Sequence, residues 1–143
     1  MTDKMQAALT SAIYVSRLSL VGESVDTDDK RLRASGLYPE WVPGPHQEGD
    51  IYNAGGQTWE CHAAYDNKEH PDITPENPET WHTFNRPLHG TSPETARPWC
   101  QPRYGTTDIY HAGECMIWTD GGVYRCLRDT NFSPEEYPEA WNK

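Results

Sequence analysis

The amino-acid sequence predicts a mainly β fold, with two small tandem β modules built around aromatic side chains and a short α-helical segment in front of them. Three observations predict it: an internal repeat, a hairpin signal in each copy, and a first stretch of 36 residues without proline, tryptophan or cysteine. The chain holds six Trp, eight Tyr and two Phe. One buried aromatic ring removes about 150–250 Å² from water, so a few rings suffice for a small module. We place the helical segment at residues 1–37, the modules at 38–86 and 96–143, and a linker at 87–95.

The N-terminal segment predicts two short helices. In the first, Asp3 with Gln6 three residues later resembles a capping box. The helix then carries an approximately helical apolar stripe of Met5, Leu9, Ala12, Ile13 and Leu20. The second helix is expected over residues 26–35, with Asp26 as its N-cap and Gly36 as its stop. Because the stripe is small, the helix either docks on its own module or meets copies of itself in a homo-oligomer, which we favour.

The internal repeat starts at Tyr38 and aligns two units of similar order and spacing. The first unit contains Trp41, Gly49-Asp50-Ile51-Tyr52, Gly55-Gly56-Gln57-Thr58-Trp59-Glu60-Cys61, Pro75, Pro78 and Trp81. The second contains Trp99, Gly113-Glu114-Cys115-Met116-Ile117-Trp118, Gly121-Gly122-Val123-Tyr124-Arg125-Cys126, Pro134, Pro138 and Trp141. One constant offset pairs Trp59 with Tyr124 and Cys61 with Cys126. Two copies of one module are therefore expected.

The hairpins predict which side chains form each core. In the second unit Asp120-Gly121 suggests a two-residue turn, which would pair Cys115 with Cys126 and place Trp118 with Arg125 on the polar face. The same register puts Tyr52, Trp59 and Cys61 of the first unit on one apolar face. The expected structural aromatic core is Trp41, Tyr52, Trp59, Trp81, Trp99, Tyr124 and Trp141.

Composition excludes several classes of function. Twelve Lys and Arg against 22 Asp and Glu give a net charge of −10, which argues against nucleic-acid binding because that depends on cations that neutralise phosphates. No apolar run is long enough to predict a membrane span. The N-terminus does not read as a signal peptide, so we expect synthesis in the cytoplasm.

Metal, cofactor and enzyme chemistry are not indicated either. The four cysteines contain no C-x-x-C pair, and the six histidines have no metal-ligand spacing, so no metal and no cofactor are expected. We favour buried free thiols over a disulfide and keep a disulfide as the alternative. No catalytic motif occurs, and modules of about 45 residues rarely enclose a catalytic cleft. We therefore expect a protein that is not an enzyme.

The repeat resembles the chitin-binding type 3 domain, the carbohydrate-binding module of families 5 and 12. That family has an opening Trp, a Gly-Asp-x-Val segment, a Gly-x-x-Tyr hairpin and a proline-rich end closed by Trp. The first copy matches this order, and the second matches it more loosely, with Gly113-Glu114 in place of Gly-Asp. Similar modules with a preceding helical segment and a Tyr-x-Cys strand occur in phage and prophage tail-region proteins. The resemblance implies a non-catalytic binder of β-linked polysaccharide.

Candidate sugar-binding residues follow from what a pyranose needs: an aromatic face for its C–H surface and planar polar groups for its hydroxyls. Members of the family place adjacent aromatics just after the hairpin, whereas this chain has His62-Ala63-Ala64-Tyr65 and Leu127-Arg128-Asp129. The remaining candidates are Tyr65 with His62 and Asn67, and Trp118 with Arg125 and Asp120. The alternative for each aromatic is ordinary packing in its module.

These observations predict a carbohydrate- or cell-surface-binding protein that acts in host attachment as a phage or prophage tail component of a virion. Its partners would be a polysaccharide or bacterial surface glycan and other tail proteins, with affinity raised by multivalency. The alternative is a structural tail-assembly protein whose modules contact other proteins without binding sugar. A third hypothesis is the targeting arm of a separately encoded hydrolase.

Overall fold

The computed structural model describes residues 2–103 and 108–143. The chain begins with the long helix α1 (Asp3–Leu20), followed by the short helix α2 (Asp28–Arg33) and the 3-10 turn η1 (Ser35–Leu37). Thr2 caps α1, because its Oγ1 accepts a hydrogen bond from the Met5 amide at 3.1 Å. Thr27 caps α2 through the Lys30 amide at 3.2 Å. Threonine caps thus replace the expected Asp3 and Asp26 caps, and the second helix is shorter than residues 26–35.

Helix α1 docks on η1 through small side chains. The buried Ser11 hydroxyl accepts a hydrogen bond from the Gly36 amide at 2.9 Å and donates to the Arg33 carbonyl at 3.3 Å. Gly36 allows this approach, since a Cβ there would lie 2.3 Å from the Ala7 carbonyl oxygen. Gly36 is therefore the place where two backbones meet, and it is not a helix stop. No helix of the described chain is long and apolar enough to span a membrane.

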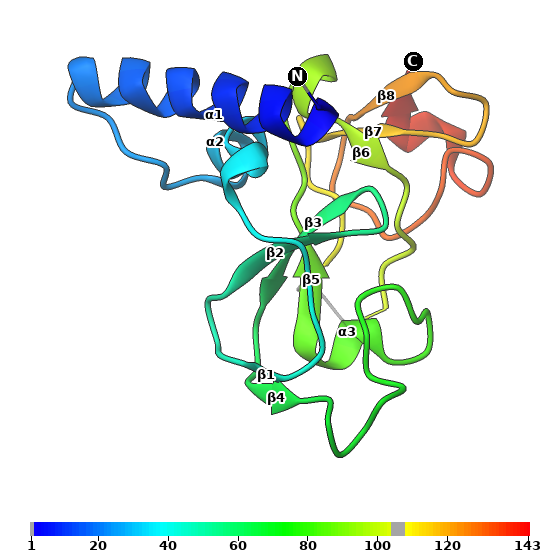
Figure 1. Ribbon diagram of the computed structural model, residues 1–143. Helices are drawn as coiled ribbons and strands as arrows, with labels where there is room; N and C mark the ends of the chain where they lie inside the picture. The colour runs from blue at the N-terminus through cyan, green and yellow to red at the C-terminus, as the bar shows by residue number, and fades with distance from the viewer. Residues whose placement is uncertain (1, 104–107) are drawn as a thin grey trace.

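Small sheets, almost entirely antiparallel, form the body of the molecule. Strands β2 (Ile51–Ala54), β3 (Gln57–Cys61) and β5 (Asn85–Pro87) form one sheet, and β1 (Pro45–His46) pairs with β4 (Tyr65–Asp66). Helix α3 (Trp81–Phe84) leads into β5. Figure 1 shows α1 and α2 across the top of the molecule, with this sheet beneath them.

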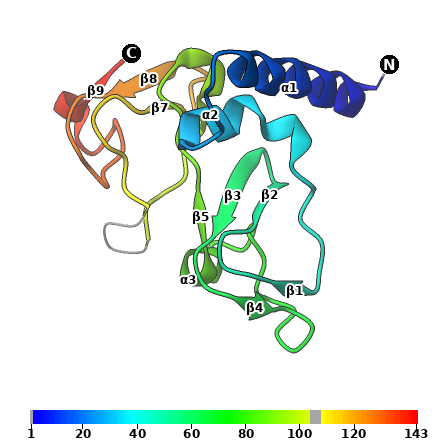
Figure 2. The same cartoon turned by 90° about the vertical axis from the view of Figure 1, so that its left-hand side faces the viewer.

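A second sheet lies to one side, as Figures 1 and 2 show. Its order is β6 (Arg97–Pro98), β7 (Cys115–Ile117), β8 (Val123–Cys126) and β9 (Trp141–Asn142), and its β6–β7 pair is parallel. The 3-10 turns η2 (Pro93–Thr95) and η3 (Pro138–Ala140) precede its outer strands. Helix accounts for 27% and strand for 22% of the described residues, so the mainly β expectation holds only loosely.

The two hairpins use different turns. In β2–β3 both Gly55 and Gly56 have positive φ, as a two-residue type I′ turn requires, and Tyr52 pairs with Trp59 as expected. In β7–β8 the Trp118 amide donates to the Gly122 carbonyl at 2.9 Å, which leaves a three-residue loop. Only Gly121 of that loop is left-handed. A single left-handed residue fits the three-residue loop better than a type I′ turn.

The different loop makes the predicted register of the second hairpin wrong by one residue. Cys115 pairs with Arg125, Met116 with Tyr124, and Ile117 with Val123. A shift of one residue exchanges the two faces of a strand. Met116 therefore points into the core beside Tyr124, and Cys115 does not oppose Cys126.

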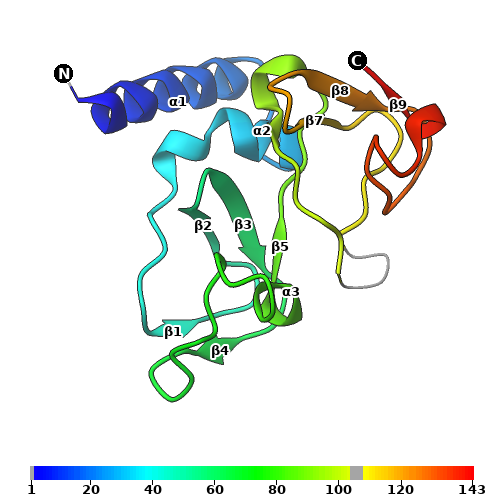
Figure 3. The same ribbon diagram turned by 90° about the vertical axis from the view of Figure 1, so that its right-hand side faces the viewer.

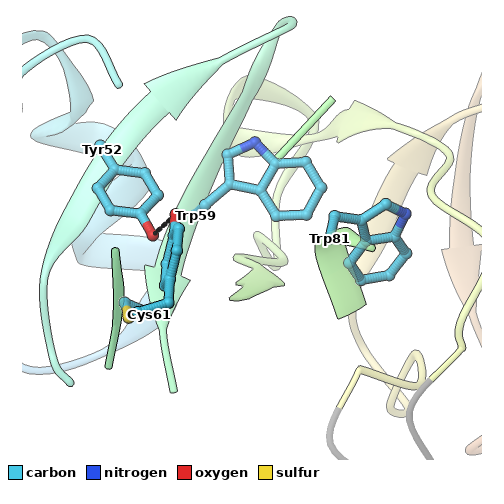
Figure 4. Close-up of a cluster of buried hydrophobic side chains, with 5 residues drawn as sticks. Tyr52, Trp59, Cys61 and Trp81 are labelled. Carbon is cyan, nitrogen blue, oxygen red and sulfur yellow. Dashed lines mark hydrogen bonds between the residues drawn. The ribbon is translucent and has the colours of Figure 1, made fainter. Parts of the chain in front are cut away.

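Two aromatic clusters contain all seven aromatics that were expected in the core. The first consists of Tyr52, Trp59, Cys61, Tyr65 and Trp81, with Trp41 and Phe84 packed against it. Figure 4 shows Trp59 and Trp81 side by side, with ring centroids 5.3 Å apart. The second consists of Tyr110, Met116, Cys126, Ala140 and Trp141, with Trp99, Trp118, Tyr124 and Tyr137 around it. All four cysteines are free thiols.

Residues 87–95 are packed and do not form the expected linker. Leu88 is fully buried, and its amide donates to the Thr58 carbonyl of β3 at 2.8 Å. Two residues later, the Gly90 carbonyl accepts the Cys115 amide of β7 at 2.8 Å. The Asp29 carboxylate of α2 accepts the Thr91 amide at 2.8 Å. This segment therefore connects both sheets to α2.

Candidate functional site

The first expected sugar-binding set lies mostly inside the protein. Tyr65 is only 8% exposed, and its hydroxyl accepts a hydrogen bond from the Trp41 indole at 2.9 Å. Asn67 is also buried, and its side-chain oxygen accepts the Gly44 amide at 2.7 Å. His62 lies within 3.0 Å of the His82 carbonyl. Because β4 pairs with β1, the Tyr65 ring is held in the core, so the prediction of Tyr65 and Asn67 as an exposed binding strip is wrong.

The second expected set is divided between two faces of its sheet. Trp118 lies at the edge of the second cluster, where its ring packs edge-on against Trp99 at 5.7 Å. Arg125 lies on the opposite face and donates to the Gly113 carbonyl at 3.0 Å. Asp120 lies in the turn and accepts the Tyr124 hydroxyl at 2.7 Å. Trp118 therefore shares a surface with Tyr124, and the expected support from Arg125 is absent because the register differs.

A half-open pocket lies where Trp118 and Tyr124 meet the end of the chain. It has a volume of about 360 Å³ and is lined by Trp118, Tyr124, Pro134, Glu135, Pro138 and Trp141. The Trp141 indole donates to the Phe132 carbonyl at 3.0 Å, which orients the ring. The turn holds the pKa of Asp120 below its ordinary value, first through the Gly122 amide and then through Tyr124 and Lys143. The anionic Asp120 in turn orients the Tyr124 phenol.

A second pocket of about 340 Å³ lies against the first cluster. It is lined by Ala54, Gly55, Trp59, Pro75, Glu76, Pro78, Trp81 and Cys100. The Trp59 indole donates to the Ala54 carbonyl at 3.1 Å, so this ring is also fixed. The Glu76 side chain extends over Gly55, where an added Cβ would lie 3.2 Å from its Cγ.

The two pockets are built from residues that the sequence repeat aligns. Trp59 corresponds to Tyr124, Trp81 to Trp141, and Pro78 to Pro138. A Pro-Glu pair precedes each closing motif, as Pro75-Glu76 and as Pro134-Glu135. Each pocket thus combines two aligned aromatic rings, two prolines and one carboxylate, and the pocket of the second copy has Trp118 as a third ring. Sequence reasoning missed the Pro-Glu pairs, although their repetition beside the closing Trp was a visible signal.

The pocket carboxylates are available to a ligand. Glu76 and Glu135 are exposed, and neither side chain makes a hydrogen bond or ion pair with any other residue that the structure describes. Trp118 and Tyr124 are half-buried and can offer a ring face to the apolar C–H surface of a sugar, whereas Trp59 (3%), Trp81 (5%) and Trp141 (6%) are buried and form the floors of their pockets. A carboxylate accepts the hydroxyl hydrogens of the sugar. The arrangement is suited to binding a neutral sugar.

Thiol and metal chemistry have no support at these pockets. Burial raises the pKa of the Cys100 thiol to about 12 and that of Cys126 to about 11, so both are protonated at neutral pH. Within residues 2–103 and 108–143, no group of three or more His, Cys, Asp or Glu side chains is placed to hold a metal ion.

A larger pocket, of about 400 Å³, lies between α1 and the β2–β3 turn. Its amide side chains are engaged within the protein: Asn53 donates to the Ser35 carbonyl at 2.9 Å, and Gln57 donates to the Pro98 carbonyl at 2.5 Å. Its lining includes Asp3, Lys4 and Ala7 of α1, which lie outside the repeat. We therefore take the repeated aromatic pockets as the candidate site.

Compared with known protein families and with curated proteins, the chain matches no family model and no curated sequence. The proposed function consequently depends on the geometry of the chain and on the residues of its repeat.

Proposed function

We propose that the protein is a non-catalytic carbohydrate-binding protein in which two tandem modules, residues 38–86 and 96–143, each present one aromatic pocket to a glycan of a bacterial surface. The observation that carries this proposal is the repeated pocket, which combines two or three aromatic rings with two prolines and a glutamate. Sugar rings stack on such faces, and a lone carboxylate selects hydroxyl donors. The resemblance of the repeat to chitin-binding type 3 modules supports the same class of ligand.

The setting that we propose is a phage or prophage tail. Its support is the order of a helical segment followed by short repeated modules, which resembles tail-region proteins. Each pocket is shallow, so a single contact would be weak. Two pockets on one chain raise the effective affinity by about 10²–10⁴ when both reach the same polymer.

The proposal is tested by retention of the full chain on insoluble chitin, cellulose and bacterial cell-wall preparations. The double variant Glu76→Gln with Glu135→Gln removes both pocket carboxylates, and Trp118→Ala removes one half-buried ring. We expect the double variant to lower the affinity for the matrix by about 5- to 30-fold. Glutamine keeps an acceptor oxygen, so each pocket loses only the difference between a charge-assisted and a neutral hydrogen bond, which is about 1 kcal/mol. Trp118→Ala should weaken retention less, because the pocket at Trp59 and Trp81 is left intact.

The matched control is Glu79→Gln with Glu139→Gln. These exposed residues belong to the same two proline-rich segments and carry the same charge, but they line neither pocket. Their removal should leave retention unchanged, and circular dichroism should show that every variant is folded. Equal retention of both double variants, or no retention of the wild type on any matrix, would refute glycan binding at these pockets.

A second candidate function is structural assembly of a tail without sugar binding. The observation that favours it is the exposed apolar face of α1, which is unusual for a surface that meets water alone. The two functions differ in what they require of Trp118. An attachment protein leaves the Trp118 ring accessible to a fluorescence quencher in the assembled particle, whereas an assembly protein protects it. Tyr65 does not discriminate between them, because it is already buried within the chain.

A further inference from the structure

Both aromatic pockets contain a carboxylate whose charge is not balanced by a neighbouring cation. Glu76 in the first pocket and Glu135 in the second are exposed, and neither side chain pairs with any other residue that the structure describes. The described residues that line the two pockets include no Lys, Arg or His. Each pocket therefore presents one unpaired negative charge to its ligand.

Three ring groups of the pockets already use their hydrogen-bond donors inside the protein. The Trp59 and Trp141 indoles donate to backbone carbonyls at 3.1 and 3.0 Å. The Tyr124 hydroxyl donates to the Asp120 carboxylate at 2.7 Å. The carbonyl oxygen of an N-acetyl group needs a donor, and these three groups do not supply one. A ligand that itself supplies the donors is better matched to the pocket carboxylates.

An ammonium group supplies both the donors and the charge. It offers three N–H donors and no acceptor, and cations also lie favourably over Trp and Tyr rings. The second module already contains one such contact, because the Lys143 ammonium lies 5.8 Å from the centre of the Tyr124 ring and 3.3 Å from the Asp120 carboxylate. Since Asp120 balances the charge of Lys143, Glu135 keeps its own charge for a ligand.

The charge of the whole chain acts in the same direction. Twelve Lys and Arg against 22 Asp and Glu give a net charge of −10, which repels anionic polymers and attracts cationic ones. This long-range attraction applies to any cationic polymer and weakens as the salt concentration rises. Recognition of a sugar depends instead on the two pockets, which belong to separate sheets that lie apart in Figure 3.

We propose that the glycan bound by the two pockets is a β-linked polysaccharide with free amino groups, in which some sugars carry an ammonium in place of an N-acetyl group. This ligand class rests on the proposed carbohydrate-binding function and narrows it. In the second pocket the sugar ring packs on the half-buried Trp118 and Tyr124, and its ammonium reaches Glu135. In the first pocket the aligned tryptophans are buried, so Glu76 makes the main contact. A neutral sugar binds the same pockets more weakly, through its hydroxyls alone.

The first test compares two soluble oligomers of β-linked glucosamine, one with all its amines free and one fully N-acetylated. Calorimetric titration of the full chain at about pH 5.5, where such amines are protonated, measures both affinities. We expect the free-amine oligomer to bind about fivefold more tightly, the gain expected from an exposed ion pair and a cation–π contact. Equal affinities, or tighter binding of the N-acetylated oligomer, would overturn the proposal.

Two double variants separate the pockets from the net charge. Glu76→Gln with Glu135→Gln should bind the two oligomers with affinities within about twofold of each other, because the amide keeps an acceptor and loses the charge. Glu79→Gln with Glu139→Gln changes the net charge equally but lies outside both pockets, so it should keep the preference of the wild type. An equal loss of preference in both variants would mean that only the net charge attracts the amine, and would refute the proposal.

A cationic peptide separates recognition of an amino sugar from recognition of an ammonium alone. An oligolysine with the same number of charges should bind several-fold more weakly than the free-amine oligomer, because it has no pyranose face to pack on Trp118. Equal binding of the peptide would indicate a basic protein partner instead and would overturn the proposal.

Failure of this proposal is distinguishable from failure of the proposed function. Retention on chitin that depends on Glu76 and Glu135, without preference for the free-amine oligomer, would refute the ammonium and leave carbohydrate binding in place. Binding of neither oligomer, together with no retention on any matrix, would refute both.

Discussion

Tyr52, Tyr65 and Asn85 form one hydrogen-bonded group inside the first aromatic cluster. The Tyr52 and Tyr65 hydroxyls lie 2.9 Å apart, and the Tyr52 hydroxyl donates to the Asn85 side-chain oxygen. Burial, followed by the Tyr65 hydrogen bond, raises the pKa of Tyr52 far above its ordinary value, so its hydroxyl stays a donor. Because every buried hydroxyl here has a partner, these phenols stabilise the core and are not available to a ligand.

Arg86 lies between two carboxylates where α2 meets the first sheet. Its guanidinium donates to Asp28 at 2.8 and 3.0 Å and to Glu60 at 2.8 Å. Burial acts to raise the pKa of Asp28, but the hydrogen bonds and charge of Arg86 outweigh it and hold that pKa below 3.8. The folded pKa is thus lower than the unfolded one. The stabilisation by Asp28 is fully present above about pH 4 and is lost as the pH falls through the folded pKa.

Asp28→Asn should therefore lower the free energy of unfolding by about 1–3 kcal/mol at pH 7, because the partly buried Arg86 loses a bidentate partner. The difference from the wild type should shrink below about pH 4, where Asp28 of the unfolded chain takes up a proton, and should disappear only as the pH falls through the lower pKa of the folded state. Urea denaturation at pH 7, 5 and 3 measures both effects. The more exposed Asp26, which pairs with Lys30 at 3.2 Å, supplies the control Asp26→Asn, with an effect below about 1 kcal/mol. An equal difference for Asp28→Asn at pH 3 and pH 7 would contradict this account.

The hairpins show how one turn residue controls the contents of a core. In β7–β8 the loop ends at Gly121, whose φ is 82°, and the face that contains Met116 and Tyr124 then points inward. An added Cβ at Gly121 would meet nothing within 4 Å, so only the backbone conformation restricts this position. The turn thus determines the register, and the register places Trp118 beside the pocket.

Two substitutions at Gly121 should separate backbone strain from packing. Gly121→Val should lower the free energy of unfolding by about 1–2 kcal/mol, because a β-branched residue disfavours the left-handed region. Gly121→Asn should cost only a few tenths of a kcal/mol, since asparagine tolerates that region better, by roughly 1 kcal/mol. Thermal unfolding of the two variants beside the wild type gives the comparison. Equal losses for both variants would show that the loop does not hold Gly121 in the left-handed region.

At the level of the whole molecule, residues 87–95 join the two aromatic clusters. Leu88 is bound to β3 and Gly90 to β7, while Asp29 of α2 holds Thr91 and Thr95 at 2.8 and 2.5 Å. Helix α1 is attached to the same region through Arg33 and Gly36. We expect the clusters to unfold together, because the segment between them contributes to both sheets and to the packing of α2.

Leu88→Ala tests this coupling. Removing a fully buried leucine side chain should lower the free energy of unfolding by about 2–5 kcal/mol. Tryptophan fluorescence, which reports both clusters, should still show one transition that coincides with the loss of secondary structure by circular dichroism. Leu37→Ala, at a half-exposed leucine, is the control, with an expected cost below about 1 kcal/mol. Two separate transitions, or a loss as small as that of the control, would mean that residues 87–95 act as a linker after all.

Structural features that are set by residues close together in the sequence could be predicted from the sequence alone. The stripe of α1 follows from its spacing, and the register of β2–β3 follows from Gly55 and Gly56, because two adjacent glycines favour one kind of turn. The aromatics of the repeat also lie in the two clusters, since few other large apolar side chains compete for those positions. In β7–β8 the Asp120-Gly121 pair is compatible with a two-residue or a three-residue loop. An error of one residue in the register exchanged the predicted core face and solvent face of β7.

The sequence alone therefore established an N-terminal amphipathic helix, a repeat and a set of core aromatics, because periodicity and turn chemistry act over a few residues. The contacts between distant segments decided the rest. Tyr65 is buried because Trp41 and Tyr52 supply partners for its hydroxyl, and Leu88 is buried where its backbone pairs with β3. The repeated pockets likewise exist because each proline-rich segment folds back onto its hairpin. Such burial depends on contacts between segments that are far apart in the sequence. Local sequence patterns do not specify which of these segments come into contact.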